Sequence, residues 1–304
     1  MVETRNADAL DVIAVGAHPD DVEIGCGGTV ARLAQQGYRV GIIDLTDGEP
    51  TPGSSGPEIR MAEAARAADV LGAAVRVTLE LPNRRLFDSF EARVELARQF
   101  RRFRPRLVLG LGDRTPMASP DHYQAMLITE AAVFYSKLTK WEAHFGDLPP
   151  YNVPAYMHYF LAYRQLSPVA VGGIVFDIGQ ALESKIAAVA CYQTQFPPER
   201  AHLFDRLRRF AEQQGMAAGF AAGEVLAAPV ALGTRDLIGL LFGEGSTVET
   251  ERAAVGGTLE SPPVESCPVE TSAPPLESSS AESPTAAGRL RDLGDPLTGF
   301  GRMP

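Results

Sequence analysis

The chain has 304 residues, of which 45% are hydrophobic and 22% are charged, and its formal net charge is -10. This length and composition suit one large domain or two small ones with a sizeable core. The acidic balance argues against a nucleic-acid partner or an anionic membrane surface, because both require a basic patch. Three widely spaced cysteines (Cys26, Cys191 and Cys267) include no CxxC motif and indicate a reducing compartment, the cytoplasm, rather than a disulfide framework.

We expect neither a secretory leader nor a membrane span. The first eight residues are polar and lack the basic segment and apolar core of a signal peptide. No apolar run approaches the roughly 20 residues that cross a bilayer. Residues 246–304 are dominated by Ser, Pro, Glu, Thr, Ala and Gly, which predicts a disordered tail after a folded domain of residues 1–245.

The first part of the chain alternates short apolar runs with longer segments of helical periodicity. The runs predict strands at residues 11–16, 40–45, 75–79 and 107–111, and the segments between them predict helices at 28–36, 58–71 and 90–103. Further elements are predicted at 122–140 (helix), 155–163 (strand), 173–178 (strand), 180–192 (helix) and 198–214 (helix), with 217–242 completing the fold. This alternation predicts a Rossmann-like α/β/α fold with a mostly parallel sheet and helices on both of its faces.

A histidine and two adjacent carboxylates follow the first predicted strand. The stretch is His18-Pro19-Asp20-Asp21, and Gly25-Cys26-Gly27-Gly28 comes shortly after it. Ligands of open α/β sheets bind at the carboxyl ends of the strands, so these side chains lie where a site is expected. His and Asp suit zinc, and a second Asp beside them can act as a base. The alternative is a helix-capping role, which a single Asp would favour.

A second Asp-His pair, Asp121-His122, follows the fourth predicted strand. By itself, His122 would be read as a surface histidine at a helix start, with Asp121 as a cap. Combined with His18 and Asp21, it supplies a third ligand and leaves one zinc position open to water. Zinc lowers the pKa of such a water to about 7 and polarises a carbonyl, and Asp20 can carry the proton from the water to a leaving amine.

These motifs resemble those of the LmbE/PIG-L-like N-acetylglucosaminyl deacetylases, and most closely the branch that deacetylates N-acetylglucosaminyl malate for bacillithiol. The resemblance covers residues 11–243. Its supporting segments are Glu58-Ile59-Arg60, Leu81-Pro82-Asn83-Arg84, Val175-Phe176-Asp177-Ile178 with Lys185, and Tyr192-Gln193-Thr194-Gln195-Phe196. It implies a Rossmann-like fold, one zinc per chain on His18, Asp21 and His122, a small N-acetylated amino-sugar substrate and a homo-oligomer.

The resemblance also implies Asp20 as the general base and Arg60 as a substrate contact. The alternative for Arg60 is a position on the helix surface, paired with Glu58 or Glu63. Further candidates for substrate binding or for the pocket are Glu49, Asn83, Arg84 and Glu224, although an exposed loop carboxylate is the default interpretation for Glu49 and Glu224. Cys26 lies near a predicted helix start, where a thiolate would be favoured, but close helix–strand packing equally explains a small residue there.

Ser119 departs from the family pattern. The family usually has His-Pro-Asp-His, in which the first histidine stabilises the oxyanion and the Asp orients it, whereas this chain has Ser119-Pro120-Asp121-His122. Loss of one oxyanion donor can lower the rate about 100- to 1000-fold. Ser119 and Asp121 remain candidate catalytic residues, and His158 is a candidate replacement donor or simply a packed strand histidine. Asp121 is then expected to hold His122 in its ligating tautomer.

Three functions are compatible with parts of the sequence. The leading one is a zinc-dependent deacetylase that acts on an N-acetylglucosamine-type substrate. The second is a zinc- and sugar-binding protein with weak or lost catalysis, which the residue Ser119 motivates. The third, a nucleotide-binding oxidoreductase, is disfavoured because the first strand–helix turn lacks GxGxxG and has the bulky, charged His18-Pro19-Asp20-Asp21 instead.

Overall fold

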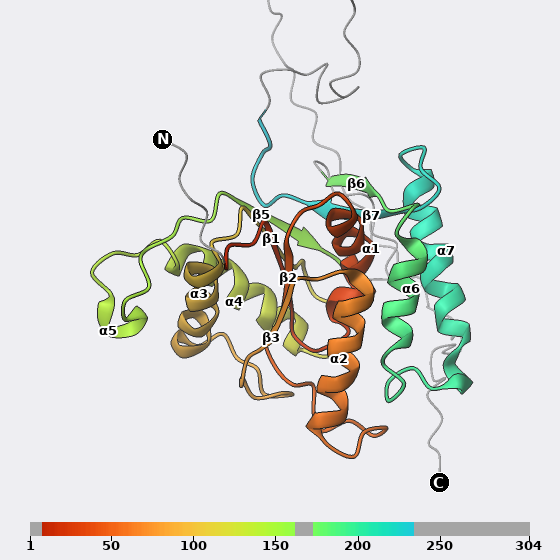
Figure 1. The fold of residues 1–304 in the computed structure, drawn as a ribbon, viewed down its shortest axis with the longest axis horizontal. Coiled ribbons are helices and arrows are strands. Elements are labelled where there is room, and N and C mark those ends of the chain that lie inside the picture. Colours follow the sequence, from red (N-terminus) through yellow and green to blue (C-terminus); the bar gives the residue numbers. More distant parts are fainter. Residues whose placement is uncertain (1–7, 162–172, 234–304) are drawn as a thin grey trace, which may run out of the picture. The chain divides into compact units, whose positions relative to one another are not determined.

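The computed structural model describes residues 8–161 and 173–233. In this part of the chain seven strands form one sheet in the order β3-β2-β1-β4-β5-β7-β6 (Figure 1). The strands are β1 (Val12–Gly16), β2 (Val40–Asp44), β3 (Val75–Thr78), β4 (Leu107–Leu111), β5 (Ala155–Tyr159), β6 (Gly173–Asp177) and β7 (Gly223–Ala227). The first five strands pair in parallel, and β7 runs antiparallel to both β5 and β6.

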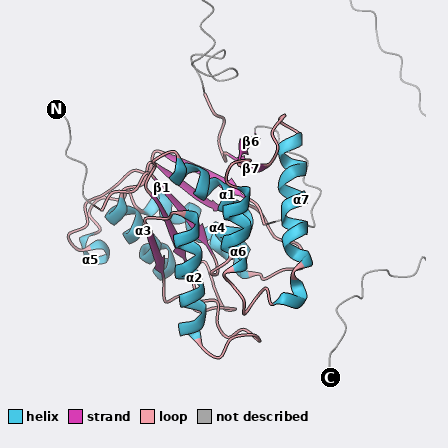
Figure 2. Ribbon diagram, turned by 45° about the vertical axis from the view of Figure 1, so that its right-hand side comes forward, coloured by secondary structure: helices cyan, strands magenta, loops and turns pink. Residues whose placement is uncertain are grey.

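Helices cover both faces of this sheet, as Figure 2 shows. One layer contains α1 (Asp21–Gln35), α2 (Pro57–Leu71), α6 (Leu182–Ala190) and α7 (His202–Met216). The other contains α3 (Phe90–Phe103), α4 (Asp121–Tyr135) and the short α5 (Glu142–Phe145). The predicted three-layer, mostly parallel α/β architecture is therefore confirmed.

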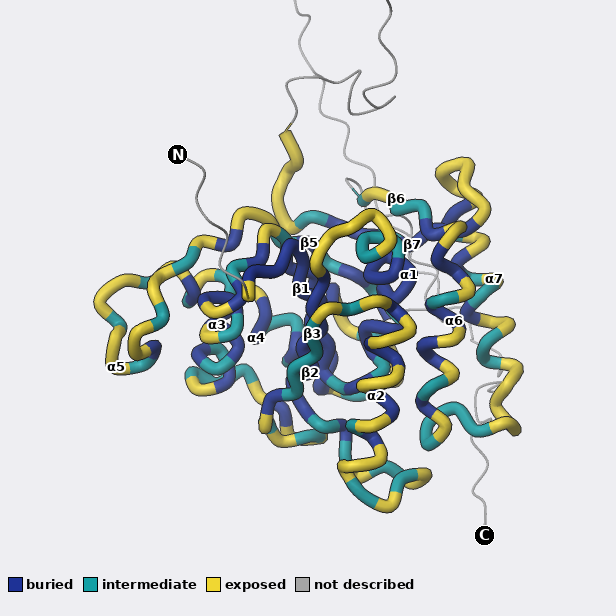
Figure 3. Tube along the Cα trace, in the orientation of Figure 1, coloured by how far each residue is buried: buried dark blue, intermediate teal, exposed yellow. Residues whose placement is uncertain are grey.

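Strands β1 and β2 are buried from end to end because helices lie over both of their faces (Figure 3). Every residue of β1 and β2 is buried, which explains why both strands read as continuous apolar runs. In the register of the sheet, Gly16 at the end of β1 lies beside Asp44 at the end of β2. The chain that follows β1 therefore leaves the sheet at its carboxyl edge, where His18 lies.

The first helix starts earlier than the sequence predicts. We expected a helix at residues 28–36, but α1 begins at Asp21 and is kinked at Cys26, whose φ is -142°. The glycines before and after the kink allow close packing and do not form a turn. A Cβ atom on Gly25 would lie 2.4 Å from the ring of Tyr159, and one on Gly28 would lie 2.5 Å from the side chain of Ile178.

The helix that carries His122 ends at Tyr135, five residues before the predicted end at Lys140. The guanidinium of Arg101 explains the stop. It donates hydrogen bonds to the carbonyl oxygens of Ser136 (3.0 Å), Leu148 (2.9 Å) and Leu138, and it lies 3.5 Å from the centre of the Phe145 ring. This buried cation binds carbonyl groups that follow α4 and so fixes a non-helical path.

The remaining elements lie close to their predicted positions. Strand β5 ends at Tyr159, before the predicted end at residue 163, and residues 162–163 lie outside the described range. The predicted helix at 198–214 is a short 3-10 turn (Pro198–Arg200) followed by α7. Residues 234–242 and the predicted tail at 246–304 also lie outside the described range, so the domain boundary stays a prediction. Among the described helices, none combines the length and apolar character needed to cross a bilayer.

Candidate metal centre and active site

The structure brings His18, Asp21 and His122 together. Each of them offers one ligand atom, and these atoms all lie within 4.8 Å of one another. His18 follows β1 by two residues, Asp21 is the first residue of α1, and His122 lies in the first turn of α4. Asp21 bridges the two rings, since its Oδ2 atom lies 3.3 Å from Nδ1 of His18 and its Oδ1 atom lies 3.3 Å from Nε2 of His122.

The carboxylate of Asp21 is fixed by the turn that leaves β1. Its Oδ2 atom accepts hydrogen bonds from the backbone amides of Ala17 (3.0 Å) and His18 (2.9 Å). Burial alone would raise the pKa of Asp21, but His122 and His18 outweigh that effect and hold the pKa well below its usual range. Asp21 is therefore ionised and oriented, as a metal ligand requires.

The carboxylate of Asp21 raises the pKa values of both histidines. Burial alone would lower the pKa of His18, but Asp21 and Asp121 reverse this and raise it to about 10. The pKa of His122 is also raised, because the attraction of Asp21 exceeds the opposing effect of burial. Without a metal ion, the carboxylate of Asp21 therefore favours the protonated, positively charged form of both histidines. The same negative environment would stabilise a metal cation between them.

The donor set fits a zinc ion. Two imidazoles and one carboxylate are the ligands of a common catalytic zinc site with one open position. The Nδ1 atom of His122 is buried and has no hydrogen-bond partner within the described part of the protein. Because Nε2 is the nitrogen of His122 beside Asp21, it is the one placed to bind the ion, and the missing partner of Nδ1 must be a group from outside those residues, such as a water.

Asp20 lies next to this group but points to a different partner. Its φ of 120° is rare for a residue with a side chain and indicates a backbone held by its surroundings. The Oδ2 atom of Asp20 lies 3.1 Å from Nη2 of Arg60, which also donates a hydrogen bond to the carbonyl of Pro19. Burial raises the pKa of Asp20 to about 7, against the opposing effect of Arg60. A carboxyl group with a pKa near neutrality suits proton transfer.

The alternative position of Arg60 on the helix surface is wrong. Its side chain is buried, and its charge is paired with Asp20 rather than with Glu58 or Glu63. The guanidinium carbon lies 5.3 Å from the centre of the Tyr192 ring. Its Nε and Nη1 atoms have no hydrogen-bond partner within the described residues. Arg60 is buried and contacts Asp20. Its role as a substrate contact stays a prediction.

Asp121 contacts a different histidine from the expected one. We expected its carboxylate to hold His122, but Oδ2 of Asp121 lies 3.3 Å from Nε2 of His18. The same oxygen accepts a hydrogen bond of 2.6 Å from the backbone amide of Arg84. The reason is geometric: Asp121 and His122 are adjacent in the first turn of α4, where neighbouring side chains point in different directions.

Ser119 has a local structural contact. Its Oγ atom accepts a hydrogen bond of 3.3 Å from the amide of Asp121, and its carbonyl accepts one of 3.3 Å from the amide of His122. Ser119 therefore accepts hydrogen bonds from amides at the start of α4, and its hydroxyl has no acceptor among the residues that the structure describes. Its role at an oxyanion stays a prediction.

Two loops at the carboxyl edge contain the other predicted substrate residues. Glu49 accepts hydrogen bonds from both the amide (2.7 Å) and the hydroxyl (2.8 Å) of Thr51. Asn83 donates a hydrogen bond of 2.8 Å to the carbonyl of Glu49 and so joins the two loops. The side chain of Arg84 is exposed, while its backbone has a φ of 61°. None of these contacts tests a role in substrate binding.

His158 and Glu224 have partners of their own. His158 lies 3.3 Å from Glu130 through Nε2 and 3.1 Å from the carbonyl of Leu111 through Nδ1, which agrees with a packed strand histidine. Glu224 is buried and accepts hydrogen bonds from the amides of Gly28 and Thr29 and from Lys185. Glu224 thus joins β7 to α1 and α6, and the default of an exposed loop carboxylate is wrong.

The suggestion of a thiolate at Cys26 is also wrong. Cys26 lies inside α1 rather than at its start, and it is fully buried. Burial raises the pKa of its thiol well above the usual value, and Glu224 adds to this. The alternative of close helix–strand packing agrees with the structure.

A buried ionic cluster that we did not predict from the sequence lies near the candidate ligand Asp21. Arg76 of β3 donates two hydrogen bonds to the carboxylate of Asp44, of 2.7 and 2.8 Å, and one to Glu23. Tyr192 donates a hydrogen bond of 2.7 Å to the same Glu23 oxygen. An arginine within the predicted strand at residues 75–79 was the available signal, because a charged side chain that is buried requires a buried partner.

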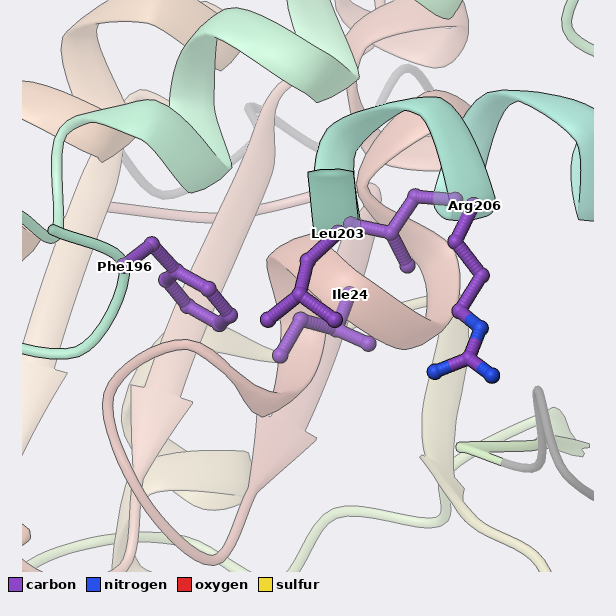
Figure 4. A pocket seen from close by; sticks show the side chains of 5 residues that line it. Ile24, Phe196, Leu203 and Arg206 are labelled. Carbon is purple, nitrogen blue, oxygen red and sulfur yellow. The ribbon is translucent and has the colours of Figure 1, made fainter. Parts of the chain in front are cut away.

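A small apolar hollow lies beside the first turn of α1. Figure 4 shows the side chains of Phe196 and Leu203 directed toward Ile24, with Arg206 at one side. Its lining includes none of the predicted ligands or substrate residues. It therefore adds nothing to the metal centre.

Comparison with known proteins shows the family of this chain. Residues 13–133 match the model of the PIG-L family, described as GlcNAc-PI de-N-acetylase. The chain is 30% identical over 222 residues to the diacetylchitobiose deacetylase of Thermococcus kodakarensis, which covers 70% of this chain and 80% of that protein. The chain belongs to the PIG-L family. All three candidate ligands lie within the matched residues.

Solved structures of similar proteins share the fold of this PIG-L family member. A conserved protein from Thermus thermophilus is 31% identical, with a TM-score of 0.65 over 74% of this chain and 97% of that one. The N,N'-diacetylchitobiose deacetylase of Pyrococcus horikoshii is 27% identical, with a TM-score of 0.63 over 72% of this chain and 83% of that one. The resemblance seen in the motifs is therefore confirmed at the level of the family, while its bacillithiol branch is not.

Proposed function

We propose that this protein is a zinc-dependent deacetylase that removes the N-acetyl group from an N-acetylglucosamine-type substrate. The observation that carries the proposal is the convergence of His18, Asp21 and His122, with the carboxylate of Asp20 beside them. Membership of the PIG-L family supports it, and so does the similarity to diacetylchitobiose deacetylases.

The residues of the site divide the chemistry between them. His18, Asp21 and His122 would hold the zinc ion, which supplies Lewis acidity to activate water and to polarise the acetyl carbonyl. Asp20 accepts a proton from the attacking water and delivers it to the departing amine, for which a pKa of about 7 is well matched. Arg60 holds Asp20 in place through their ion pair.

Ser119 motivates one alternative. Its hydroxyl is a weaker donor to an oxyanion than the histidine that is usual in the family. A zinc- and sugar-binding protein with weak or lost catalysis is therefore the second candidate. The two candidates differ only in turnover, because both require the same metal centre and sugar site.

The exact substrate, its contacts, the oligomeric state and the cellular compartment are proposed from the resemblance alone. We propose N-acetylglucosaminyl malate as the first substrate to try, with diacetylchitobiose and an inositol-linked N-acetylglucosamine as comparisons. Arg60, Glu49, Asn83, Arg84 and His158 are the proposed substrate contacts. A homo-oligomer located in the cytoplasm is proposed on the same ground.

The test combines zinc content with amine release on purified protein, using these three N-acetylglucosaminides and comparing wild type with Ser119→His. About one zinc per chain and clear release by wild type would establish the deacetylase. Zinc without release, together with rescue by Ser119→His, would favour the impaired protein. Absence of zinc would overturn the ligand assignment. Treatment with a chelator should abolish release, and added zinc should restore it.

A further inference from the structure

The carboxylate of Asp121 connects a ligand of the candidate metal centre to a distant loop. One of its oxygens, Oδ2, lies 3.3 Å from Nε2 of His18 and accepts a hydrogen bond of 2.6 Å from the amide of Arg84. Asp121 is almost fully buried, with an exposed fraction of 1%. The contact between the two side chains therefore lies inside the protein, where water screens it little.

The backbone on each side fixes the position of this carboxylate. Asp121 begins α4, and its own amide is bound by the hydroxyl of Ser119. Arg84 has a φ of 61°, a conformation rare for a residue with a side chain, and this aims its amide at Asp121. The loop after β3 thus sets the position of a side chain that touches a residue after β1.

The two nitrogens of His18 face different partners. Nδ1 lies 3.3 Å from Asp21, whose other oxygen lies 3.3 Å from His122, so this nitrogen faces the group of three candidate ligands. Nε2 faces Asp121, which is not part of that group. Nδ1 is therefore the nitrogen placed to coordinate a cation shared with Asp21, and Nε2 is the one placed to keep its proton and donate it to the carboxylate of Asp121.

We infer that Asp121 is a positioning residue that acts through His18, and that the loop at Arg84 holds it in place by a backbone hydrogen bond. This inference rests on the proposed metal site but not on the deacetylase activity. Asp121 fixes the ring orientation and the tautomer of His18, so that Nδ1 is the ligand atom. Loss of such a partner to a ligating histidine typically lowers metal affinity about 10- to 100-fold.

The test measures zinc affinity by competition with a chromophoric chelator. Asp121→Ala should weaken zinc binding by about 10- to 100-fold, and Asp121→Asn should weaken it less, because an amide oxygen can still accept the proton of His18. Asp113→Asn is the matched control, since Asp113 is exposed in the loop before α4 and its φ of 59° suits asparagine.

A second measurement needs no variant. In ¹H–¹⁵N spectra of the zinc-loaded wild type, the ring proton of His18 should be on Nε2. A proton on Nδ1, or equal zinc affinity for wild type and both Asp121 variants with native circular dichroism, would overturn the inference. Zinc bound by wild type without amine release would end the proposed deacetylase but leave the role of Asp121 standing.

Discussion

The guanidinium of Arg60 and the carboxylate of Asp20 form a buried ion pair with a separation of 3.1 Å. The two residues come from different elements, since Arg60 lies on α2 and Asp20 immediately precedes α1. Arg60, the predicted substrate contact, is therefore bound directly to Asp20, the predicted base. A substitution at either residue disturbs the other.

Replacement of Arg60 tests whether it positions Asp20. Arg60→Met removes the cation with little change in volume, and we expect kcat to fall on the order of 100-fold, as small displacements of a catalytic group do. Loss of the proposed substrate contact should also raise KM, and Arg60→Lys should recover part of kcat because it restores the charge. Steady-state kinetics on the best substrate measure both constants. A rise in KM with an unchanged kcat would show that Arg60 contacts the substrate but does not position Asp20.

Asp20→Asn separates metal binding from proton transfer. Asp20 has its polar contact with Arg60 rather than with the three ligands, so the variant should keep about one zinc per chain, as wild type does. Its kcat should fall by about 100- to 10,000-fold, because an amide cannot accept the proton from water. Zinc analysis and amine release on the same sample provide the measurement. Full activity in this variant would remove Asp20 as the base.

Two glycines of α1 provide a matched pair for the packing of this helix. A Cβ on Gly25 would lie 2.4 Å from the Tyr159 ring, whereas one on Gly27 would meet nothing closer than 3.6 Å. Gly25→Ala should lower the free energy of unfolding by about 1–3 kcal/mol through overpacking. Gly27→Ala should leave it unchanged or raise it by up to about 1 kcal/mol, because alanine favours a helix. Urea unfolding distinguishes them, and equal effects would contradict the close packing of Gly25 against Tyr159.

Tyr159 predicts how stability changes at high pH. Burial raises its pKa well above the usual value, and the nearby Cys26, Asp21 and Asp44 add to the effect. Below pH 10 the phenol is neutral in both the folded and the unfolded chain, so its contribution is fully present. Above pH 10 the unfolded chain ionises first, and the free energy of unfolding falls by about 1.4 kcal/mol per pH unit for each such proton.

Tyr159→Phe should make this alkaline decrease less steep by about one proton. The phenol also donates a hydrogen bond of 2.8 Å to the carbonyl of Val15, so the variant should be less stable by about 1 kcal/mol at neutral pH. The exposed Tyr38 is the control, since Tyr38→Phe removes a phenol that water already reaches. Denaturant unfolding between pH 8 and about pH 11 measures the slopes. An unchanged slope in Tyr159→Phe would show that other groups cause the decrease.

Truncation after residue 245 tests the predicted domain boundary. The described elements end with β7 at Ala227, and the composition changes near Gly245. The shortened chain should keep the melting temperature of the full chain within about 2 °C and its full zinc content. A larger decrease would place part of the folded domain beyond residue 245.

Much of the fold follows from local sequence patterns. The predicted helix at 90–103 coincides with α3, and the predicted strand at 107–111 coincides with β4, because a strong periodicity and a nearby Pro105 define both. The start of α1 could not be found in this way. Its glycines are typical of a turn, and only side chains far away in the sequence explain them: Tyr159 packs against Gly25, and Ile178 packs against Gly28.

The candidate site was predictable as a set of residues but not as a set of contacts. His18, Asp21 and His122 follow adjacent strands, and that suffices to bring them together. The contact of Asp121 with His18 depends on how the first turn of α4 is oriented, and no spacing in the sequence encodes that. The burial of Arg60 depends likewise on Asp20, whose positive φ no local rule predicts.

The order of the last strands has a consequence for the chain as it is synthesised. Among the described strands, β6 pairs only with β7, which is the last of them to leave the ribosome. All three candidate ligands emerge long before it. The amides of Gly28 and Thr29 in α1 can form their hydrogen bonds to Glu224 only after β7, which contains Glu224, has been synthesised. A nascent chain thus exposes Asp21, the candidate ligand at the start of α1, before that helix is bound by Glu224.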